Sequence, residues 1–134
     1  MKHLPIIIGV VVFAYLIVQF LPLLRARRVV GQPTPDLREL DPGLDVEHGT
    51  LLLYFWSARC PMCSPVTRVV DELAETHDNV IKIDVAAHPE LARRFGIMGT
   101  PTLIRTHQGR IERMLVGAKP PDQIRALLQQ DASA

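Results

Sequence analysis

An uncharged apolar stretch near the N-terminus restricts the possible folds of this chain more than any other feature. Residues 4–24 carry no charged side chain, and Gln19 is their one clearly polar residue. A helix of about 21 residues extends roughly 30 Å, which is enough to cross the hydrocarbon core of a bilayer. None of its faces would be polar, so it does not suit the surface of a soluble core. We expect one transmembrane helix, and the soluble domain has to form from the rest of the chain.

The flanks of this stretch favour an uncleaved anchor over a signal peptide. A signal peptide has an apolar region of about 7 to 15 residues and ends in a cleavage site of small residues. Here Arg25, Arg27 and Arg28 follow directly, so residues 1–28 are expected to form a transmembrane anchor with a basic flank. These arginines outnumber the basic groups at the other end, where Lys2 lies, so the positive-inside rule predicts that the domain lies in the cytoplasm. The margin is about one charge, which leaves a periplasmic or other extracytoplasmic domain as the alternative. Either way, we expect a single-pass protein of the inner (plasma) membrane.

Both cysteines of the chain lie in the run Cys60-Pro61-Met62-Cys63, between an apolar strand-like stretch and a helical pattern. A thiol is nucleophilic as its thiolate, and the N-terminus of a helix favours a negative charge. Cys60 is expected at that terminus. Cys63 follows one helical turn later, within reach of the first sulfur, so the pair could close and reopen a disulfide. We predict a catalytic dithiol of Cys60 and Cys63.

Other uses of the cysteine pair fit the sequence less well. A structural disulfide across so short a loop would stabilise the fold little. A zinc site needs about four ligands, but there is no second cysteine pair and the histidines are scattered. We therefore predict no metal site, although a copper-carrying dithiol remains open because soft thiolates suit Cu(I). The net charge of +1 gives no indication of a nucleic-acid partner.

The rest of the chain divides into a linker and an α/β domain. Prolines and glycines interrupt any period over residues 29–50, which predicts a tether with one helical turn near residues 36–40. In residues 51–134, strands are expected at 51–56, 80–84, 102–106 and 110–116, the last two joined by His107-Gln108-Gly109. Helices are expected from the apolar positions Val66, Val69, Val70, Leu73 and Ala74, from Pro89 to Gly96, and from Pro120 onward. This order predicts a mixed sheet with helices on both faces.

With these elements in place, the domain resembles thioredoxin from residue 51 to about Gln130. The resemblance rests on separated motifs in the right order: Phe55-Trp56, Cys60-Pro61-Met62-Cys63, Asp84, Phe95-Gly96-Ile97, Gly99-Thr100-Pro101-Thr102 and Val116-Gly117-Ala118. It implies a thioredoxin-like fold with a shortened N-terminal part, preceded here by the transmembrane helix. It also implies no cofactor beyond the redox-active disulfide.

The resemblance further implies how a substrate is bound. The peptide bond before Pro101 would be cis and lie beside the dithiol, and the backbone of Thr100 would pair with the substrate chain. Gly117 would let the backbone pass close to the active centre. The residues expected to bind substrate are Trp56, Pro61, Met62, Thr100, Pro101 and Gly117. The implied partners are proteins that contain disulfides and an upstream electron donor, such as a thioredoxin reductase or a membrane thiol carrier.

Five positions depart from the pattern of the family. Tyr54 stands where thioredoxins carry a buried aspartate, and is expected beneath Cys63; Val80 stands at the position of a nearby lysine. Arg59 replaces a second tryptophan, and Pro-Met replaces Gly-Pro between the cysteines. These changes leave the fold and the dithiol chemistry but affect the redox potential and the choice of partner.

We therefore expect a membrane-tethered thioredoxin-like thiol–disulfide oxidoreductase that reduces protein disulfides. One alternative is an outward-facing protein that acts in cytochrome maturation or in extracytoplasmic disulfide reduction. A second is a metal-binding or scaffold module that uses the fold without turnover.

Overall fold

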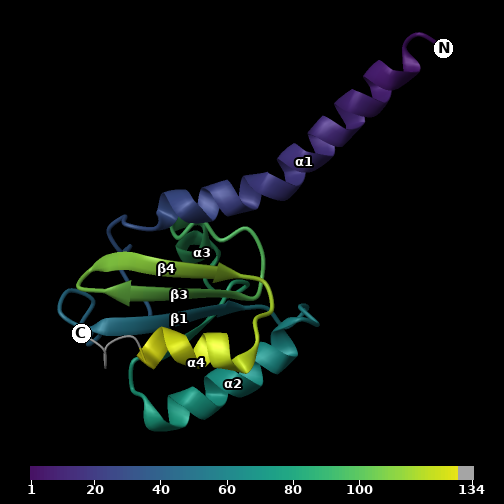
Figure 1. The fold of residues 1–134 in the computed structure, drawn as a ribbon. Coiled ribbons are helices and arrows are strands. Elements are labelled where there is room, and N and C mark those ends of the chain that lie inside the picture. Colours follow the sequence, from purple (N-terminus) through teal and green to yellow (C-terminus); the bar gives the residue numbers. More distant parts are fainter. Residues whose placement is uncertain (130–134) are drawn as a thin grey trace.

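The computed structural model describes residues 1–129, which form one long helix followed by a small α/β domain (Figure 1). The elements in chain order are α1 (Leu4–Val29), β1 (Thr50–Trp56), α2 (Cys63–Thr76), β2 (Val80–Asp84), α3 (Pro89–Arg94), β3 (Thr102–His107), β4 (Arg110–Val116) and α4 (Pro121–Gln129). This is the predicted order of strands and helices. Residues 130–134 of the predicted domain, including Gln130 at the end of the resemblance, lie outside the described residues.

The four strands form one mixed sheet in the order β2-β1-β3-β4. β1 runs parallel to β2 and antiparallel to β3, and β3 and β4 form an antiparallel hairpin. The hairpin turn is Gln108-Gly109, with φ values of 49° and 75°, a left-handed conformation that suits a two-residue hairpin loop. β1 lies in the interior of the sheet, which explains why five consecutive residues of this strand are buried.

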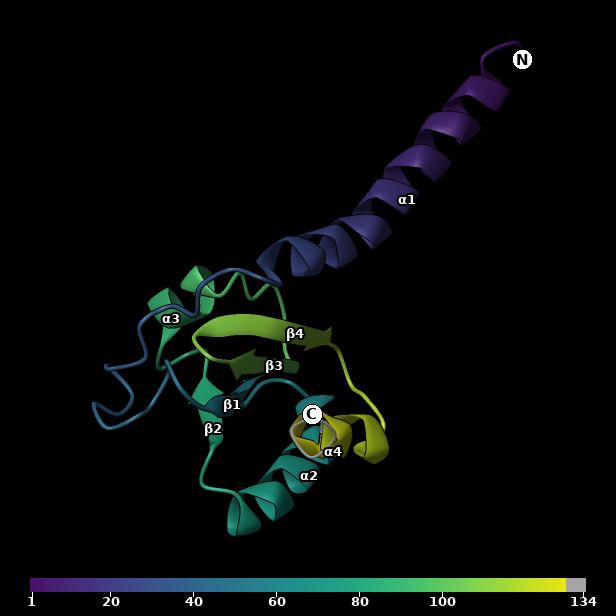
Figure 2. The ribbon, with the colours of Figure 1, turned by 60° about the vertical axis from the view of Figure 1, so that its left-hand side comes forward.

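Each face of the sheet has its own apolar core, and Figure 2 shows the helices on either side. Successive residues of a strand point to opposite faces. Leu52 and Tyr54 therefore pack with α2 and α4, whereas Leu53 and Phe55 pack with α3. The ring of Phe55 lies 5.3 Å from that of Phe95, which follows α3. The predicted apolar stripe of α2 is confirmed except at its end, where Ala74 is exposed.

The segment before β1, expected to be a free tether, packs on the α3 face of the sheet. Leu37 is fully buried, and Leu40, Leu44 and Val46 lie half-buried against the same core. The expected helical turn is a hydrogen-bonded turn in which Leu40 N donates to Leu37 O at 2.9 Å. These leucines follow no period, so no element could be inferred from their spacing. Their burial removes apolar surface from water on a face that α3 alone does not cover.

The same segment also pairs with the outer edge of β4. Gly31 N donates to Ile111 O at 2.7 Å, and Ile111 N donates to Gln32 O at 2.9 Å. Further along, Thr34 N donates to Gly109 O at 2.8 Å. These bonds satisfy backbone groups of an edge strand that would otherwise be open.

Helix α1 is long and apolar enough to cross a membrane, and its side chains are exposed along most of its length. Its N-terminal part extends away from the domain, while its C-terminal part lies over β4 and α3 (Figures 1 and 2). The helix changes direction between these two parts. Pro22 lies inside the helix and cannot donate the usual backbone bond, which is a common cause of such a bend.

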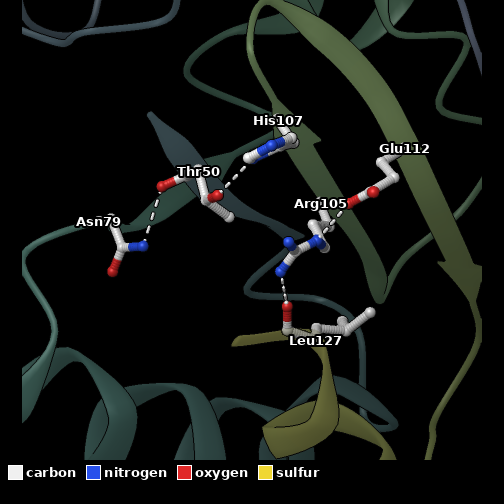
Figure 3. A network of polar contacts seen from close by, with 6 residues as sticks. All are labelled: Thr50, Asn79, Arg105, His107, Glu112 and Leu127. Carbon is white, nitrogen blue, oxygen red and sulfur yellow. Dashed lines mark hydrogen bonds and ion pairs between the residues drawn. The ribbon is translucent and has the colours of Figure 1, made fainter. Parts of the chain in front are cut away.

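A polar network lies at the end of the sheet where β1 begins (Figure 3). Arg105 on β3 is buried; its Nε donates to Glu112 on β4 and its Nη1 donates to the carbonyl oxygen of Leu127 in α4. Asn79 Nδ2 donates to Thr50 O at 2.9 Å, and Thr50 Oγ1 lies 2.8 Å from Nδ1 of His107. Nothing in the sequence pattern indicates a buried arginine in β3. The network ties α4 to the hairpin at the end of β1 remote from the cysteines.

Candidate active site

The two cysteines form a disulfide between the end of β1 and the start of α2, with their Cα atoms 5.4 Å apart. Cys60 was expected at the N-terminus of this helix with Cys63 one turn later; α2 begins at Cys63, and Cys60 lies in the turn directly before it. Cys60 N donates to Ser57 O, and Cys63 N donates to Cys60 O, both at 3.2 Å. Because the sulfurs are bonded, the Cys60 sulfur still lies at the N-terminal end of α2, where the helix dipole favours an anion.

The two sulfurs differ in their access to solvent. The side chain of Cys63 is 3% exposed, whereas Cys60 is half-buried. Pro61 and Met62 between them are exposed, and Met62 retains 55% of its surface. The Cys60 sulfur lies 3.4 Å from the carbonyl oxygen of Thr100. A group that approaches from solvent therefore reaches Cys60 first.

The loop before β3 supports the outer side of the disulfide. The Thr100–Pro101 peptide bond is cis, as the resemblance implies, and Pro101 is buried while Thr100 stays half-exposed beside Cys60. Gly117 N donates to Pro101 O at 2.9 Å. Gly117 was expected to allow a close approach of the backbone, but the space around its missing Cβ is open. Its φ of 86° is the reason for a glycine here, because other residues rarely adopt that conformation.

Two shallow hollows flank the disulfide. The first is lined by Ser57, Arg59, Cys60, Pro61, Met62 and Thr100, and so brings together four of the eight predicted site residues. The second lies on the other side and is lined by Trp56, Ser57, Ala58, Cys60, Cys63, Ser64, Thr67, Arg68 and Lys82. Pro101 and Gly117 line neither hollow and act on the site through the backbone.

Tyr54 lies beneath Cys63, as expected. Its side chain is fully buried, and its hydroxyl donates to Cys63 O at 3.1 Å. Since the phenol has one proton, the 2.8 Å contact with Thr67 is a bond in which the Thr67 hydroxyl donates. Burial raises the pKa of Tyr54, the Asp71 carboxylate raises it further, and the bond from Thr67 opposes both. The phenol is therefore neutral near pH 7 and ties β1 to the first turn of α2.

Lys82 is a residue of the site that the sequence did not reveal. It lies on β2 opposite Tyr54, with Nζ 5.5 Å from the centre of the Trp56 ring and 2.9 Å from Oδ1 of Asp71. The position of the family's lysine is occupied by Val80, which packs against the α2 core. The two-residue period of a strand places Lys82 on the same face, and that signal could have identified it. The Nε1 atom of Trp56 is buried and has no hydrogen-bond partner among the described residues.

No group of three or more histidine, cysteine, aspartate or glutamate side chains within residues 1–129 is arranged to hold a metal ion.

Comparison with known proteins gives a consistent result. A family model described as Thioredoxin matches residues 38–130. Thioredoxin from Alicyclobacillus acidocaldarius is 40% identical over 81 residues, which cover 58% of this chain and 77% of that protein. Thioredoxin from Staphylococcus aureus is 31% identical over 88 residues, which cover 63% of this chain and 85% of that protein.

Solved structures extend the similarity to three dimensions. A mutant thioredoxin from Halobacterium salinarum matches with a TM-score of 0.61 and 32% identity, covering 76% of this chain and 86% of that one. Thioredoxin from Malassezia sympodialis matches with a TM-score of 0.57 and 24% identity, covering 75% of this chain and 93% of that one. The second similarity, at its lower identity, concerns the fold alone.

Proposed function

This chain belongs to the thioredoxin family, and on that basis we propose that it is a membrane-tethered oxidoreductase that reduces protein disulfides through Cys60 and Cys63. The difference in exposure between the two sulfurs supports the proposal most directly. Cys60 is open to a partner and lies beside the Thr100 carbonyl, whereas Cys63 is covered and can reach only Cys60 or a group already bound to it.

The proposed reaction is thiol–disulfide exchange in two steps. The Cys60 thiolate attacks one sulfur of the partner disulfide; a Cys60–partner bond forms, and the other partner sulfur leaves as a thiolate. Cys63, as its thiolate, then attacks the Cys60 sulfur, closes the Cys60–Cys63 bond and releases the second partner sulfur. Two electrons pass from the dithiol to the partner, and the released thiolates take up the two protons that the cysteines lose.

Residues around the sulfurs would bind the partner chain. Thr100 presents backbone groups next to Cys60, and Pro61 and Met62 give the approach an uncharged, exposed surface. Trp56 closes the opposite side, and Pro101 with Gly117 holds the loop in place.

For the tether, we propose that α1 spans the inner membrane and that the domain lies in the cytoplasm, where a thioredoxin reductase or a membrane thiol carrier would return electrons. The apolar length of α1 and the arginines at its C-terminal end support this orientation. A topology reporter fused to the C-terminus tests it. Signal from the extracytoplasmic side would instead favour the outward-facing role.

The roles of the sulfurs can be tested by trapping. In the full chain in detergent, Cys63→Ser should accumulate mixed disulfides with a disulfide-containing protein, because attack remains possible and resolution does not. Cys60→Ser should form none, and mass spectrometry of the adducts distinguishes the two. Equal trapping by both variants would show that the roles are wrongly assigned. Failure of the unmodified chain to accelerate insulin-type disulfide reduction by a dithiol would favour the scaffold alternative.

A further inference from the structure

We propose that Arg25, Arg28 and Arg93 form a binding site for the headgroup of an anionic phospholipid. This inference rests on the membrane tethering proposed above and concerns a part of the molecule distinct from the disulfide. It assigns a ligand to a pocket of about 410 Å³ where the end of α1 meets the domain.

Two elements far apart in the sequence build this pocket. α1 contributes Arg25, Arg28 and Val29; α3 contributes Arg93, and the following loop contributes Gly96, Ile97 and Met98. Figure 2 shows the C-terminal part of α1 close to α3. The approach is tight, since a Cβ added to Gly96 would lie only 3.3 Å from Cγ2 of Val29. The pocket therefore forms only when the anchor and the domain are in contact.

The position of the pocket along α1 indicates a lipid headgroup. The apolar stretch ends at Leu24, and Arg25 is the first charged residue after it. A helix rises about 1.5 Å per residue, so the arginines of α1 lie within roughly 6 Å of the end of the apolar stretch. This is the depth at which phosphate groups lie when such a helix spans a bilayer.

The charge and shape of the pocket also suit a phosphodiester. Of the three guanidinium groups, that of Arg93 pairs with a carboxylate, with its Nη2 2.7 Å from Oε2 of Glu90. Arg25 and Arg28 pair with no carboxylate among residues 1–129, and Arg25 Nη1 donates to Sδ of Met98 at 3.0 Å. Guanidinium groups bind phosphate oxygens in a bidentate manner. Val29, Ile97 and Met98 supply an apolar floor for the glycerol and the first carbons of the acyl chains.

Occupation of the pocket would orient the domain. The loop from Gly96 to Met98 continues through Gly99 to Thr100, which lies beside the Cys60 sulfur. A headgroup held between Arg28 and Arg93 would therefore fix the α3 face toward the bilayer and set the height of the disulfide above it.

Hydrogen exchange tests this proposal in the full chain. The protein is placed in nanodiscs of phosphatidylcholine, or of an equal mixture of phosphatidylcholine and phosphatidylglycerol. Amides of residues 95–98 should exchange more slowly, on the order of threefold, in the anionic discs. Arg28→Gln and Arg93→Gln should each remove this protection. The controls Arg27→Gln and Arg94→Gln delete the same charge from neighbours that do not line the pocket, and should keep it.

Each other outcome has a defined meaning. Equal loss of protection in the control variants would indicate diffuse attraction to the membrane and would overturn the proposed site. Equal exchange rates in the two disc types would overturn it as well. Equal protection by inorganic phosphate in neutral discs would assign the pocket to a free anion instead of a lipid. Failure of the chain to enter the discs would refute the membrane tether. The absence of disulfide reduction by the unmodified chain in the same discs would refute the redox function. The three hypotheses therefore fail separately.

Discussion

Replacement of Tyr54 by phenylalanine should weaken the fold without stopping the second step of disulfide exchange. The hydroxyl makes two hydrogen bonds in a buried position, one to Cys63 O and one from Thr67. Each such bond contributes about 1 kcal/mol, so the free energy of unfolding should fall by about 1–2 kcal/mol. Unfolding of the full chain in detergent, followed by the fluorescence of the single tryptophan, Trp56, measures this change.

The effect on chemistry should be much smaller. Because the pKa of Tyr54 is raised by burial, its phenol is protonated near pH 7 and cannot take the proton of Cys63. Loss of a true general base would slow the step by roughly 100-fold or more. We expect stopped-flow measurements of mixed-disulfide resolution to change by less than about threefold. A loss of about 100-fold in a folded variant would show that the hydroxyl belongs to the proton path and would refute this reasoning.

The pH dependence provides a second readout. A pKa that is higher in the folded state than the ordinary value of 10.0 means that the protonated phenol stabilises the fold below pH 10. This stabilisation is lost as the pH rises through the folded-state pKa. The unmodified protein should therefore lose its stability advantage over Tyr54→Phe in alkaline solution, while the difference stays constant near pH 7. A constant difference across the alkaline range would contradict the assigned pKa shift.

Two further predictions concern the fold. Leu37→Ala should lower the free energy of unfolding by about 2–4 kcal/mol, because it leaves a cavity under the segment before β1. Val30→Ala, at an exposed position, should change this free energy little. Equal small effects of the two substitutions in urea unfolding would mean that the segment does not pack against the sheet. Gly117→Ala should lower the free energy of unfolding by about 1 kcal/mol because of its positive φ alone. Gly99→Ala, where φ is not positive and the space is also open, should leave this free energy nearly unchanged. Thermal unfolding that ranks the two variants in the opposite order would exclude backbone strain as the cause.

The sheet and its helices could be predicted because their residues repeat with the period of the element they form. The continuous apolar run at 51–56 indicated β1, the connection His107-Gln108-Gly109 indicated the hairpin of β3 and β4, and the Pro-first, Gly-last pattern indicated α3. The cis bond before Pro101 followed from the resemblance and not from any period.

Features that depend on contacts between distant residues could not be predicted. Leu37 has no periodic neighbours, so only the folded sheet shows what it covers. Arg105 looks like an exposed strand residue until the carbonyl of Leu127 and the carboxylate of Glu112 are placed beside it. The start of α2 at Cys63, with Cys60 in the turn before it, is likewise not fixed by the spacing of the apolar positions from Val66 onward.

The packed segment between α1 and β1 limits how far the disulfide can travel. A free chain of about 20 residues could extend roughly 65 Å and let the domain sample a wide volume. Here Gly31 and Gln32 pair with β4, and Leu37 is locked in the core, so almost none of that length is available as slack. On a membrane-spanning α1, the domain would search only the layer next to the bilayer, within its own diameter of roughly 30 Å. Such a short reach would restrict the partners to proteins whose disulfides lie close to the membrane, and disulfides held farther out would not be reached.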